Sequence, residues 1–399
     1  MPSVIIINTC TVTSKADQKA RRVIRKALRD YPDACIVVTG CYAQLDKDDI
    51  LKLDTANSQR LFVIKKDEIL NFIKNGSLDK NNPNLCESVP VRGQFQFNPK
   101  RFSEHTRCLL KIQDGCDNHC TYCKIRLARG KSISLEPDEV LSRLRILEKS
   151  YAETVLTGVN ISQYKSINNE QVKYNNLAAL LECLLLGTER ITIRLSSLAP
   201  DCVDEQLAKV LSHKRIRPHF HLSVQSCSKT VLEKMGRTYN AQTVKDAVKL
   251  LRDVKDDPFL ACDIITGFPG ETETEFNETL NICAELDFAW IHVFPYSKRK
   301  GTPAYSFTDN IAEIEITNRV QQITSLAKQG RASYVKRWLG REVDVLMEKN
   351  GYGTTENYLK AYVRCNEQMP SPGTALYCRL LEPDNPGDYD VIAALVRRV

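Results

Sequence analysis

The sequence has no long apolar run. Its unbroken aliphatic stretches, such as residues 4–7 of 399, are far short of the roughly 20 residues that a membrane-spanning helix needs. The chain also opens without the basic-then-apolar pattern of a secretion signal. We therefore predict a cytoplasmic protein with no membrane partner.

A strong charge of either sign is missing as well. The 56 basic and 49 acidic residues give a formal charge of +7, which is mild for this length. Local clusters are more informative, because residues 15–29 contain seven basic side chains and only Asp17 as an acid, and residues 100–131 contain eight basic and three acidic ones. Both are candidate surfaces for phosphate groups. A solvated helix face and a solvated loop explain them equally well.

Cysteine, in contrast, is abundant: there are 15, an odd number, without an export signal. A reducing compartment keeps such cysteines as thiols, metal ligands or core residues. Several lie in apolar strand or helix patterns, where a free cysteine acts as a small hydrophobic residue; these are Cys35, Cys183, Cys262 and Cys283. The remainder make metal or iron-sulfur chemistry the leading hypothesis.

The order of apolar patterns predicts an α/β protein. Residues 4–8 read as a strand, a basic helix capped by Ser14 runs to about Arg29, and residues 35–39 read as a second strand. From about residue 107 to 330, six strand-then-helix units predict a parallel sheet, open or closed into an incomplete barrel, with function at the carboxyl ends of its strands. After a basic helix ending near Trp338, short strands predict a small antiparallel barrel of a type that often binds nucleic acid.

The most informative segment is a cysteine loop with the spacing C-x3-C-x2-C, formed by Cys116, Cys120 and Cys123 directly after the first strand of the repeated unit. Three thiolates on one compact loop can hold three corners of a 4Fe-4S cluster and leave the fourth iron open to another ligand. Structural zinc usually draws on two CxxC-type pairs, or on CxxC with paired histidines, and no matching pair follows this loop.

This spacing resembles the radical S-adenosylmethionine superfamily, and the rest of the chain resembles its methylthiotransferase family. The matching segments are NTCTVTSKADQKARR (8–22), TGCYAQ (39–44), LKIQDGCDNHCTYCKIRLARG (110–130), LTGVNI (156–161), RLSSLAP (194–200), HLSVQSCSKTVLEKMGRTYN (221–240), DIITGFPGETETEF (263–276) and HVFPYSKRKGTPAY (292–305). They span nearly the whole chain in order, so the resemblance is specific.

The resemblance implies four parts. These are an N-terminal α/β methylthiotransferase domain (1–78) that lacks its first strand and helix, a linker (79–101), a radical-SAM core built as a partial (β/α)6 barrel (102–334), and a TRAM RNA-binding barrel (337–399). In such a core, the open iron binds S-adenosylmethionine, and an electron from the cluster cleaves it to a 5′-deoxyadenosyl radical.

Site residues follow from the same resemblance. Cys116, Cys120 and Cys123 correspond to the catalytic cluster ligands. The S-adenosylmethionine contacts correspond to Tyr122, Gly158, Asn160, Ser196, Ser197, Gln225, Pro295 and Tyr296. Strand-end Asn, Ser and Gln side chains also cap turns and helices, which is the alternative for those residues. Cys227 departs from the family pattern, which has glycine there, and we expect it to crowd this pocket unless the loop is shifted.

The resemblance also implies a second, auxiliary 4Fe-4S cluster that donates sulfur. Cys10 and Cys41, each in a turn that closes an N-terminal strand, match two of its three cysteine ligands. The third family cysteine lies upstream of a strand like residues 4–8, and this chain begins too late to contain it. We expect a shortened chain, with Cys35 or Cys86 as substitute ligands in the alternative case. By spacing alone, Cys10 and Cys41 read as core residues at strand ends.

The implied reaction converts a C–H bond into C–SCH3. The residues after Cys10 resemble the branch that acts on C2 of N6-threonylcarbamoyladenosine beside the tRNA anticodon, so the expected partners are a tRNA anticodon loop and an electron donor protein. Phosphate contacts are predicted for Arg129, Lys298, Arg299 and Lys300. The alternatives are isopentenyladenosine in tRNA, a ribosomal-protein aspartate, or a zinc-stabilised RNA-binding protein without catalysis.

Overall fold

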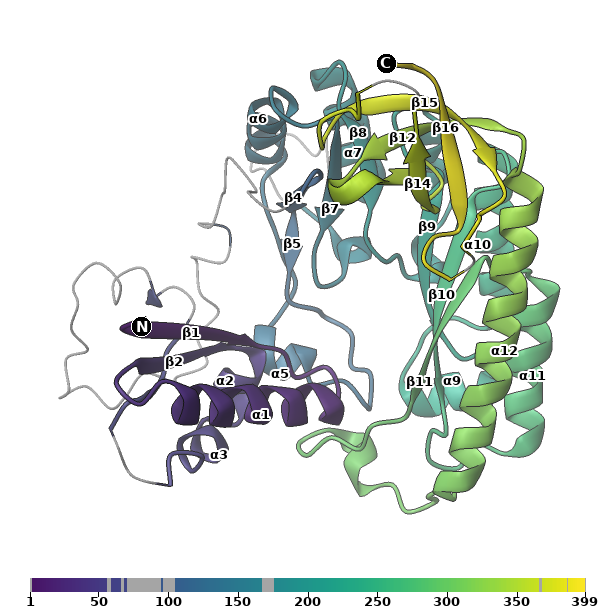
Figure 1. Ribbon diagram of the computed structural model, residues 1–399. Helices are drawn as coiled ribbons and strands as arrows, with labels where there is room; N and C mark the ends of the chain where they lie inside the picture. The colour runs from purple at the N-terminus through teal and green to yellow at the C-terminus, as the bar shows by residue number, and fades with distance from the viewer. Residues whose placement is uncertain are drawn as a thin grey trace. The chain divides into compact units, whose positions relative to one another are not determined.

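The computed structural model describes residues 2–55, 59–65, 68–69, 95, 105–166, 176–365, 368–385 and 387–398. Two compact units are formed (Figure 1). The first contains Met1–Phe97, Asp114–Ser132 and Ser297–Phe307, and the second contains Asn98–Gln113, Ile133–Tyr296 and Thr308–Val399. The predicted linker 79–101 lies, apart from residue 95, outside the described residues, and the four domain boundaries stay a prediction.

The first unit is a three-stranded parallel sheet with helices, in the strand order β1-β2-β3. Its elements are β1 (Val4–Thr9), α1 (Ser14–Asp30), β2 (Cys35–Gly40), α2 (Cys41–Leu45), α3 (Lys47–Leu51), β3 (Leu61–Val63), α5 (Ile125–Arg129) and the 3-10 helix η3 (Pro303–Ser306). The predicted βαβ start is thereby found. The predicted helix cap is wrong, because Thr13 rather than Ser14 caps α1 by accepting a hydrogen bond from the Ala16 N–H at 3.2 Å.

The second unit begins with six parallel strands in two sheets, β4-β7-β8 and β11-β10-β9. Parallel bridges Ile193–Ile216 and Leu198–Leu222 join the two sheets. The strands are β4 (Cys108–Lys111), β7 (Glu153–Thr157), β8 (Thr192–Leu195), β9 (His219–Gln225), β10 (Phe259–Thr266) and β11 (Trp290–Pro295), and the short β5 (Gln113–Asp114) and β6 (Ile133–Ser134) pair with each other. This confirms the prediction of a partial (β/α)6 barrel.

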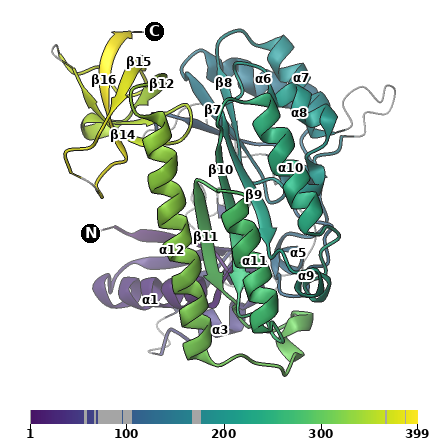
Figure 2. The ribbon, with the colours of Figure 1, turned by 90° about the vertical axis from the view of Figure 1, so that its right-hand side faces the viewer.

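Helices follow these strands as the patterns predict. They are α6 (Pro137–Glu148), η1 (Ile161–Gln163), α7 (Leu177–Gly187), η2 (Pro200–Cys202), α8 (Glu205–Leu211), α9 (Lys229–Met235), α10 (Ala241–Val254), α11 (Glu273–Glu285) and α12 (Glu313–Trp338). Figure 2 shows α10, α11 and α12 on one face of β9, β10 and β11. In the described part of the chain, no helix is long and apolar enough to cross a membrane.

The C-terminal strands close into a barrel in the order β12-β13-β14-β16-β15. Its elements are β12 (Glu342–Met347), η4 (Lys349–Gly351), β13 (Tyr352–Thr355), β14 (Lys360–Arg364), β15 (Ala375–Leu381) and β16 (Val391–Arg398). The predicted barrel is confirmed, but the prediction that it is antiparallel is wrong for one pair, because β14 and β16 run parallel. An odd number of strands cannot alternate in direction around a closed barrel, so one parallel pair is unavoidable.

The barrel shares its core with the strands of the second unit. Barrel side chains such as Val345 and Leu376 belong to one buried cluster with Phe259 of β10 and with Tyr334 and Trp338 of α12. The barrel is therefore packed on the parallel sheet by apolar contacts rather than attached through a chain segment alone.

Candidate functional site

The cysteine loop belongs to the first unit, where backbone contacts define its shape. The Cys116 N–H donates to the Gly130 carbonyl at 3.1 Å, which ties the start of the loop to its return. Gly115 has a φ of +72°, and a Cβ there would lie 1.9 Å from the Lys131 carbonyl oxygen. Only glycine fits this close approach. At the other end, the Cys123 N–H donates to the Cys120 carbonyl at 3.1 Å.

The donor chemistry of this loop fits an iron-sulfur cluster. Cys116, Cys120, Cys123 and the intervening Tyr122 are all partly exposed. The Ile125 N–H lies 3.4 Å from the Cys123 sulfur, an arrangement that stabilises a thiolate ligand. No three His, Cys, Asp or Glu side chains among the described residues are placed around a single metal ion. A cubane cluster does not require that arrangement, because each cysteine binds a different iron.

The auxiliary pair lies in the same unit. Thr9 and Gly40 are partners in the register of β1 and β2, so Cys10 and Cys41 follow directly at the carboxyl ends of neighbouring strands. Cys10 is exposed and Cys41 is buried. Cys35 begins β2, six residues before Cys41, and at about 3.3 Å per residue its Cα is about 20 Å away.

That separation is decisive for the predicted substitute ligand. Cys35 lies at the wrong end of the strand and cannot complete the auxiliary site, while Cys86 lies outside the described residues. The described residues therefore supply two of the three cysteines that the auxiliary cluster needs, and as they stand they do not fit it.

Arg129 contacts Cys41 and also Asp114, which precedes Cys116 by two residues. Its Nε–H donates to the Cys41 sulfur at 3.0 Å, and its Nη1 lies 3.4 Å from the carboxylate of the fully buried Asp114. Burial lowers the pKa of Arg129, but attraction to Cys41 and Asp114 outweighs it and leaves the pKa above its usual value. The predicted phosphate contact of Arg129 thus competes with two partners inside the protein.

Arg299 is also engaged internally. Its Nη1 lies 2.8 Å from the Asp17 carboxylate on α1, and its Nη2 donates to the Thr11 carbonyl at 2.8 Å. The side chain is only 4% exposed, so it is not presented to a phosphate, and the prediction for Arg299 is corrected. Its neighbours Lys298 and Lys300 are exposed, and the Lys298 ammonium lies 5.4 Å from the centre of the Tyr305 ring.

The basic cluster of residues 15–29 forms the solvent face of α1. Its buried face consists of Asp17, Ala20, Ile24 and Ala27. The exposed basic side chains are Lys15, Lys19, Arg22, Arg25, Lys26 and Arg29. Arg21 is the exception, because its guanidinium donates to the Tyr42 hydroxyl at 2.8 Å.

Apart from Tyr122 of the cysteine loop, the predicted S-adenosylmethionine residues lie at the carboxyl ends of the strands in the second unit. Gly158 and Asn160 follow β7, and Ser196 and Ser197 follow β8. Gln225 is the last residue of β9, Pro295 is the last residue of β11, and Tyr296 comes directly after it. Two contacts fix this edge: the Tyr296 N–H donates to the Thr266 carbonyl at 2.8 Å, and the Tyr296 ring meets Phe268 edge-on at 5.2 Å. Burial raises the pKa of Tyr296.

Gln225 and Cys227 shape this edge where β9 ends. Gln225 is buried with a φ of +65°, a conformation that costs a non-glycine residue free energy. The expectation that Cys227 crowds the pocket is not met. Instead its thiol hydrogen-bonds that of Cys283 on α11, and its N–H donates to the Thr279 hydroxyl at 3.0 Å. The extra side chain is thus absorbed by packing against α11.

Sequence reasoning missed several residues that shape this edge. The Gln113 side chain accepts from the Asn160 N–H at 2.8 Å, and a Cβ on Gly158 would lie 2.9 Å from it. Glu271 accepts from the Gly267 N–H at 2.6 Å and pairs with Arg319 of α12 at 2.7 Å. Burial raises the pKa of Glu271 despite these partners. The contacts of Gln113 with Asn160 and of Glu271 with Arg319 join distant parts of the chain, so a local pattern does not reveal them.

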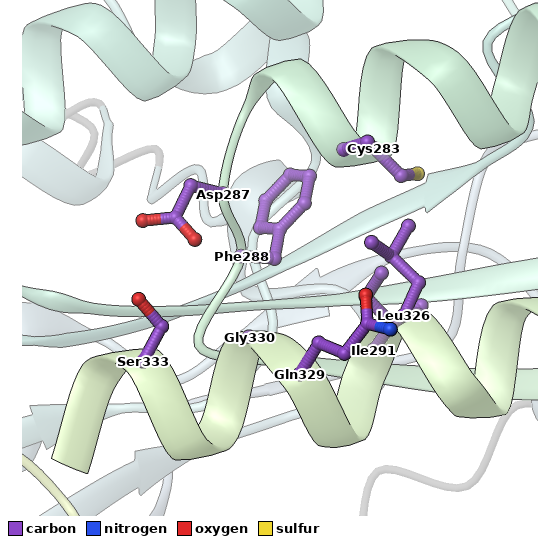
Figure 3. A pocket seen from close by; sticks show the side chains of 9 residues that line it. Cys283, Asp287, Phe288, Ile291, Leu326, Gln329, Gly330 and Ser333 are labelled. Atoms are coloured by element: carbon purple, nitrogen blue, oxygen red, sulfur yellow. The ribbon is translucent and has the colours of Figure 1, made fainter. Parts of the chain in front are cut away.

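A cavity of about 170 Å³ lies elsewhere in the second unit (Figure 3). It is enclosed by α11, α12 and the start of β11, with Cys283, Phe288, Ile291, Leu326 and Gly330 among its lining residues. This is the helix-covered side of the sheet, and none of the predicted site residues lines the cavity.

Comparisons with known proteins agree with this arrangement. Residues 110–283 match the model of the radical SAM superfamily, and residues 1–61 match that of the uncharacterized protein family UPF0004. The threonylcarbamoyladenosine tRNA methylthiotransferase MtaB of Treponema pallidum is 37% identical over 89% of this chain and 84% of its own. The tRNA-2-methylthio-N(6)-dimethylallyladenosine synthase of Protochlamydia amoebophila is 30% identical over 90% of this chain and 80% of its own.

Among solved structures, the radical S-adenosylmethionine methyltransferase TsrM from Kitasatospora setae has a TM-score of 0.53. It is 15% identical, and the match covers 76% of this chain and 63% of that one. At this identity the likeness concerns the fold, which agrees with the partial barrel described above.

Proposed function

The chain belongs to the tRNA methylthiotransferase family of radical S-adenosylmethionine enzymes, and from that premise we propose that it adds a methylthio group to C2 of N6-threonylcarbamoyladenosine beside the tRNA anticodon. The observation that carries the choice of substrate is the 37% identity to a relative of that name over most of both chains. The zinc-stabilised, non-catalytic alternative is set aside by this membership.

The residues that would bind the cofactors divide between the two units. Cys116, Cys120 and Cys123 would bind a 4Fe-4S cluster, and the strand-end residues from Gly158 to Tyr296 would contact S-adenosylmethionine. When bound, these cofactors supply a 5′-deoxyadenosyl radical able to activate a C–H bond. The loop contributes thiolates held by backbone contacts, and Gln113 and Glu271 fix the backbone around the strand ends.

We further propose that Cys10 and Cys41 contribute to the sulfur-donating site, completed by a ligand outside the described residues. Their position at neighbouring strand ends, with Arg129 3.0 Å from the Cys41 sulfur, supports a shared role. An electron donor protein would supply the reducing electron, and the reaction would take place in the cytoplasm, where tRNA is available.

The RNA would be attracted by exposed cations of the first unit and by the terminal barrel. Six basic side chains lie on the solvent face of α1, and Lys298 and Lys300 are exposed. Such contacts bind phosphates without reading sequence, whereas an anticodon loop presents its bases unpaired and can be unstacked for chemistry.

The test is mass spectrometry of tRNA nucleosides from a strain that lacks the gene and any redundant enzyme. The methylthio form of threonylcarbamoyladenosine should disappear, and its persistence would refute the proposal. The Protochlamydia relative favours isopentenyladenosine-type substrates as the second candidate. Loss of the methylthio-isopentenyl nucleoside instead would select that candidate, and loss of neither would return the ribosomal-protein aspartate to consideration.

A further inference from the structure

Tyr358, from the loop between β13 and β14, lies against three strands of the partial barrel. The centre of the Tyr358 ring lies 5.0 Å from the Arg194 guanidinium of β8 and 4.0 Å from the His219 ring of β9. It lies 6.0 Å from the Phe259 ring of β10. β8 belongs to one sheet, and β9 and β10 belong to the other. Because Arg194, His219 and Phe259 reach the same ring from both sheets, we infer that these side chains lie on the interior face of the barrel.

A second set of side chains lies on this interior face above Tyr358. Side chains alternate along a strand, so His221 and Asp263 share the face of His219 and Phe259. His292 is the register partner of Asp263 on β11 and therefore lies on the same face. We refer to His221, Asp263 and His292 as the histidine layer. Unlike the buried His219, its members are partly or fully exposed.

Direct contacts hold the histidine layer together. The His221 Nε2 lies 2.9 Å from the Asp263 carboxylate, and the His221 and His292 rings stack with their centres 5.1 Å apart. The Trp290 indole N–H donates to Nδ1 of His292 at 3.3 Å, so a neutral His292 carries its proton on Nε2 and can donate from there. Burial lowers the pKa of His292, with His221 lowering it further and Asp263 opposing, which keeps the ring neutral near pH 7.

The position of the layer suits a substrate group rather than S-adenosylmethionine. His292 precedes Pro295 by three residues and His221 precedes Gln225 by four, so the layer lies about 10 Å below the edge where the predicted cofactor contacts gather. On the other sheet, Leu109, Val155 and Arg194 are register partners on the interior face. Lys111, two residues after Leu109, adds a cation to that face.

We propose that the histidine layer binds the amino-acid part of the substrate base, which in threonylcarbamoyladenosine carries a hydroxyl and a carboxylate. This rests on the proposed function. The layer offers a donor at His292 and a histidine–carboxylate contact between His221 and Asp263, and the cation of Lys111 lies on the facing sheet. An isopentenyl group has no polar atom. It would displace the water molecules that hydrogen-bond to these side chains and would form no hydrogen bond in their place.

Binding of three anticodon stem-loops of one sequence to the anaerobically reconstituted protein tests this inference. The loops carry adenosine, threonylcarbamoyladenosine or isopentenyladenosine at the target position. We define the affinity ratio as the affinity for the threonylcarbamoyl loop divided by the affinity for the adenosine loop. Wild type should have a ratio above one, and His292→Leu should reduce this ratio by about tenfold. Asp263→Asn should also reduce this ratio, and His292→Gln, which keeps a donor, should restore part of it.

The affinity ratio is independent of the fraction of protein that is folded, so a destabilised variant stays informative. His213→Leu is the matched control, because His213 is an exposed histidine on a loop of the same unit, and its ratio should equal that of wild type. An unchanged affinity ratio in both His292→Leu and Asp263→Asn would overturn the role of the histidine layer and leave the proposed function untouched. Failure of wild type to methylthiolate the threonylcarbamoyl loop would instead refute the proposed function.

Discussion

Replacement by methionine should distinguish three adjacent basic residues, Lys298, Arg299 and Lys300. The replacement of Arg299 should lower stability strongly, and the replacement of either lysine should not. Arg299 is 4% exposed and pairs at 2.8 Å with Asp17, which is 12% exposed. Removing one partner of such a buried pair costs about 3–5 kcal/mol, since the other charge is left without compensation. Lys298 and Lys300 are exposed, and their replacement should change stability by no more than about 0.5 kcal/mol.

Native-state hydrogen exchange of the α1 amides measures this difference in the intact protein. At about 1.4 kcal/mol per factor of ten, Arg299→Met should reduce protection of the amides around Asp17 by roughly a hundredfold or more. The double variant Arg299→Met with Asp17→Asn should lose less amide protection than the two single variants lose in sum, because neither charge is then left without a partner.

RNA binding should show the reverse pattern. When a cation that binds one phosphate of a single strand is removed, the slope of log affinity against log salt concentration falls by about 0.7. Lys298→Met and Lys300→Met should each reduce the slope, whereas Arg299→Met should leave it unchanged. A reduced slope with normal α1 protection in Arg299→Met would refute the assignment of Arg299 to a buried pair.

Further predictions concern the two cysteine sites, the strand ends and the barrel base. Cys120→Ala should abolish cleavage of S-adenosylmethionine, while Cys10→Ala should spare cleavage and stop thiolation; equal loss of both, measured by chromatography of 5′-deoxyadenosine and modified RNA, would reject this division. Gly115→Ala should reduce the iron content of reconstituted protein, because its Cβ would lie 1.9 Å from the Lys131 oxygen, and normal iron would contradict that role of the turn. Gln225→Gly should relieve about 1 kcal/mol of backbone strain yet weaken S-adenosylmethionine binding by calorimetry, with Gln225→Ala as the control that keeps the strain. Glu153→Leu should reduce the free energy of unfolding by about 3–5 kcal/mol in urea titrations, because it leaves the buried Arg194 and Arg217 without their shared partner.

The sequence alone determined those features that are written locally. The C-x3-C-x2-C spacing placed three thiols on one short loop, because neighbours within eight residues cannot separate far. The alternation of strand and helix patterns predicted the partial barrel, since each element's apolar periodicity depends on its own residues. The same local reading missed the Thr13 cap, the short strand β3 and the parallel pair of β14 and β16.

Tertiary structure decided the environment of each charged or reactive side chain. Nothing near Arg299 in sequence distinguishes it from Lys298, and its partner Asp17 lies 282 residues earlier. Cys35 is a reasonable substitute ligand in sequence, but β2 places it at the opposite end of the strand from Cys41. The histidine layer draws one residue from each of three strands, so it exists only once their register is fixed. Burial and pairing arise from contacts between distant segments, and a sequence pattern shows which elements form but not which side chains meet.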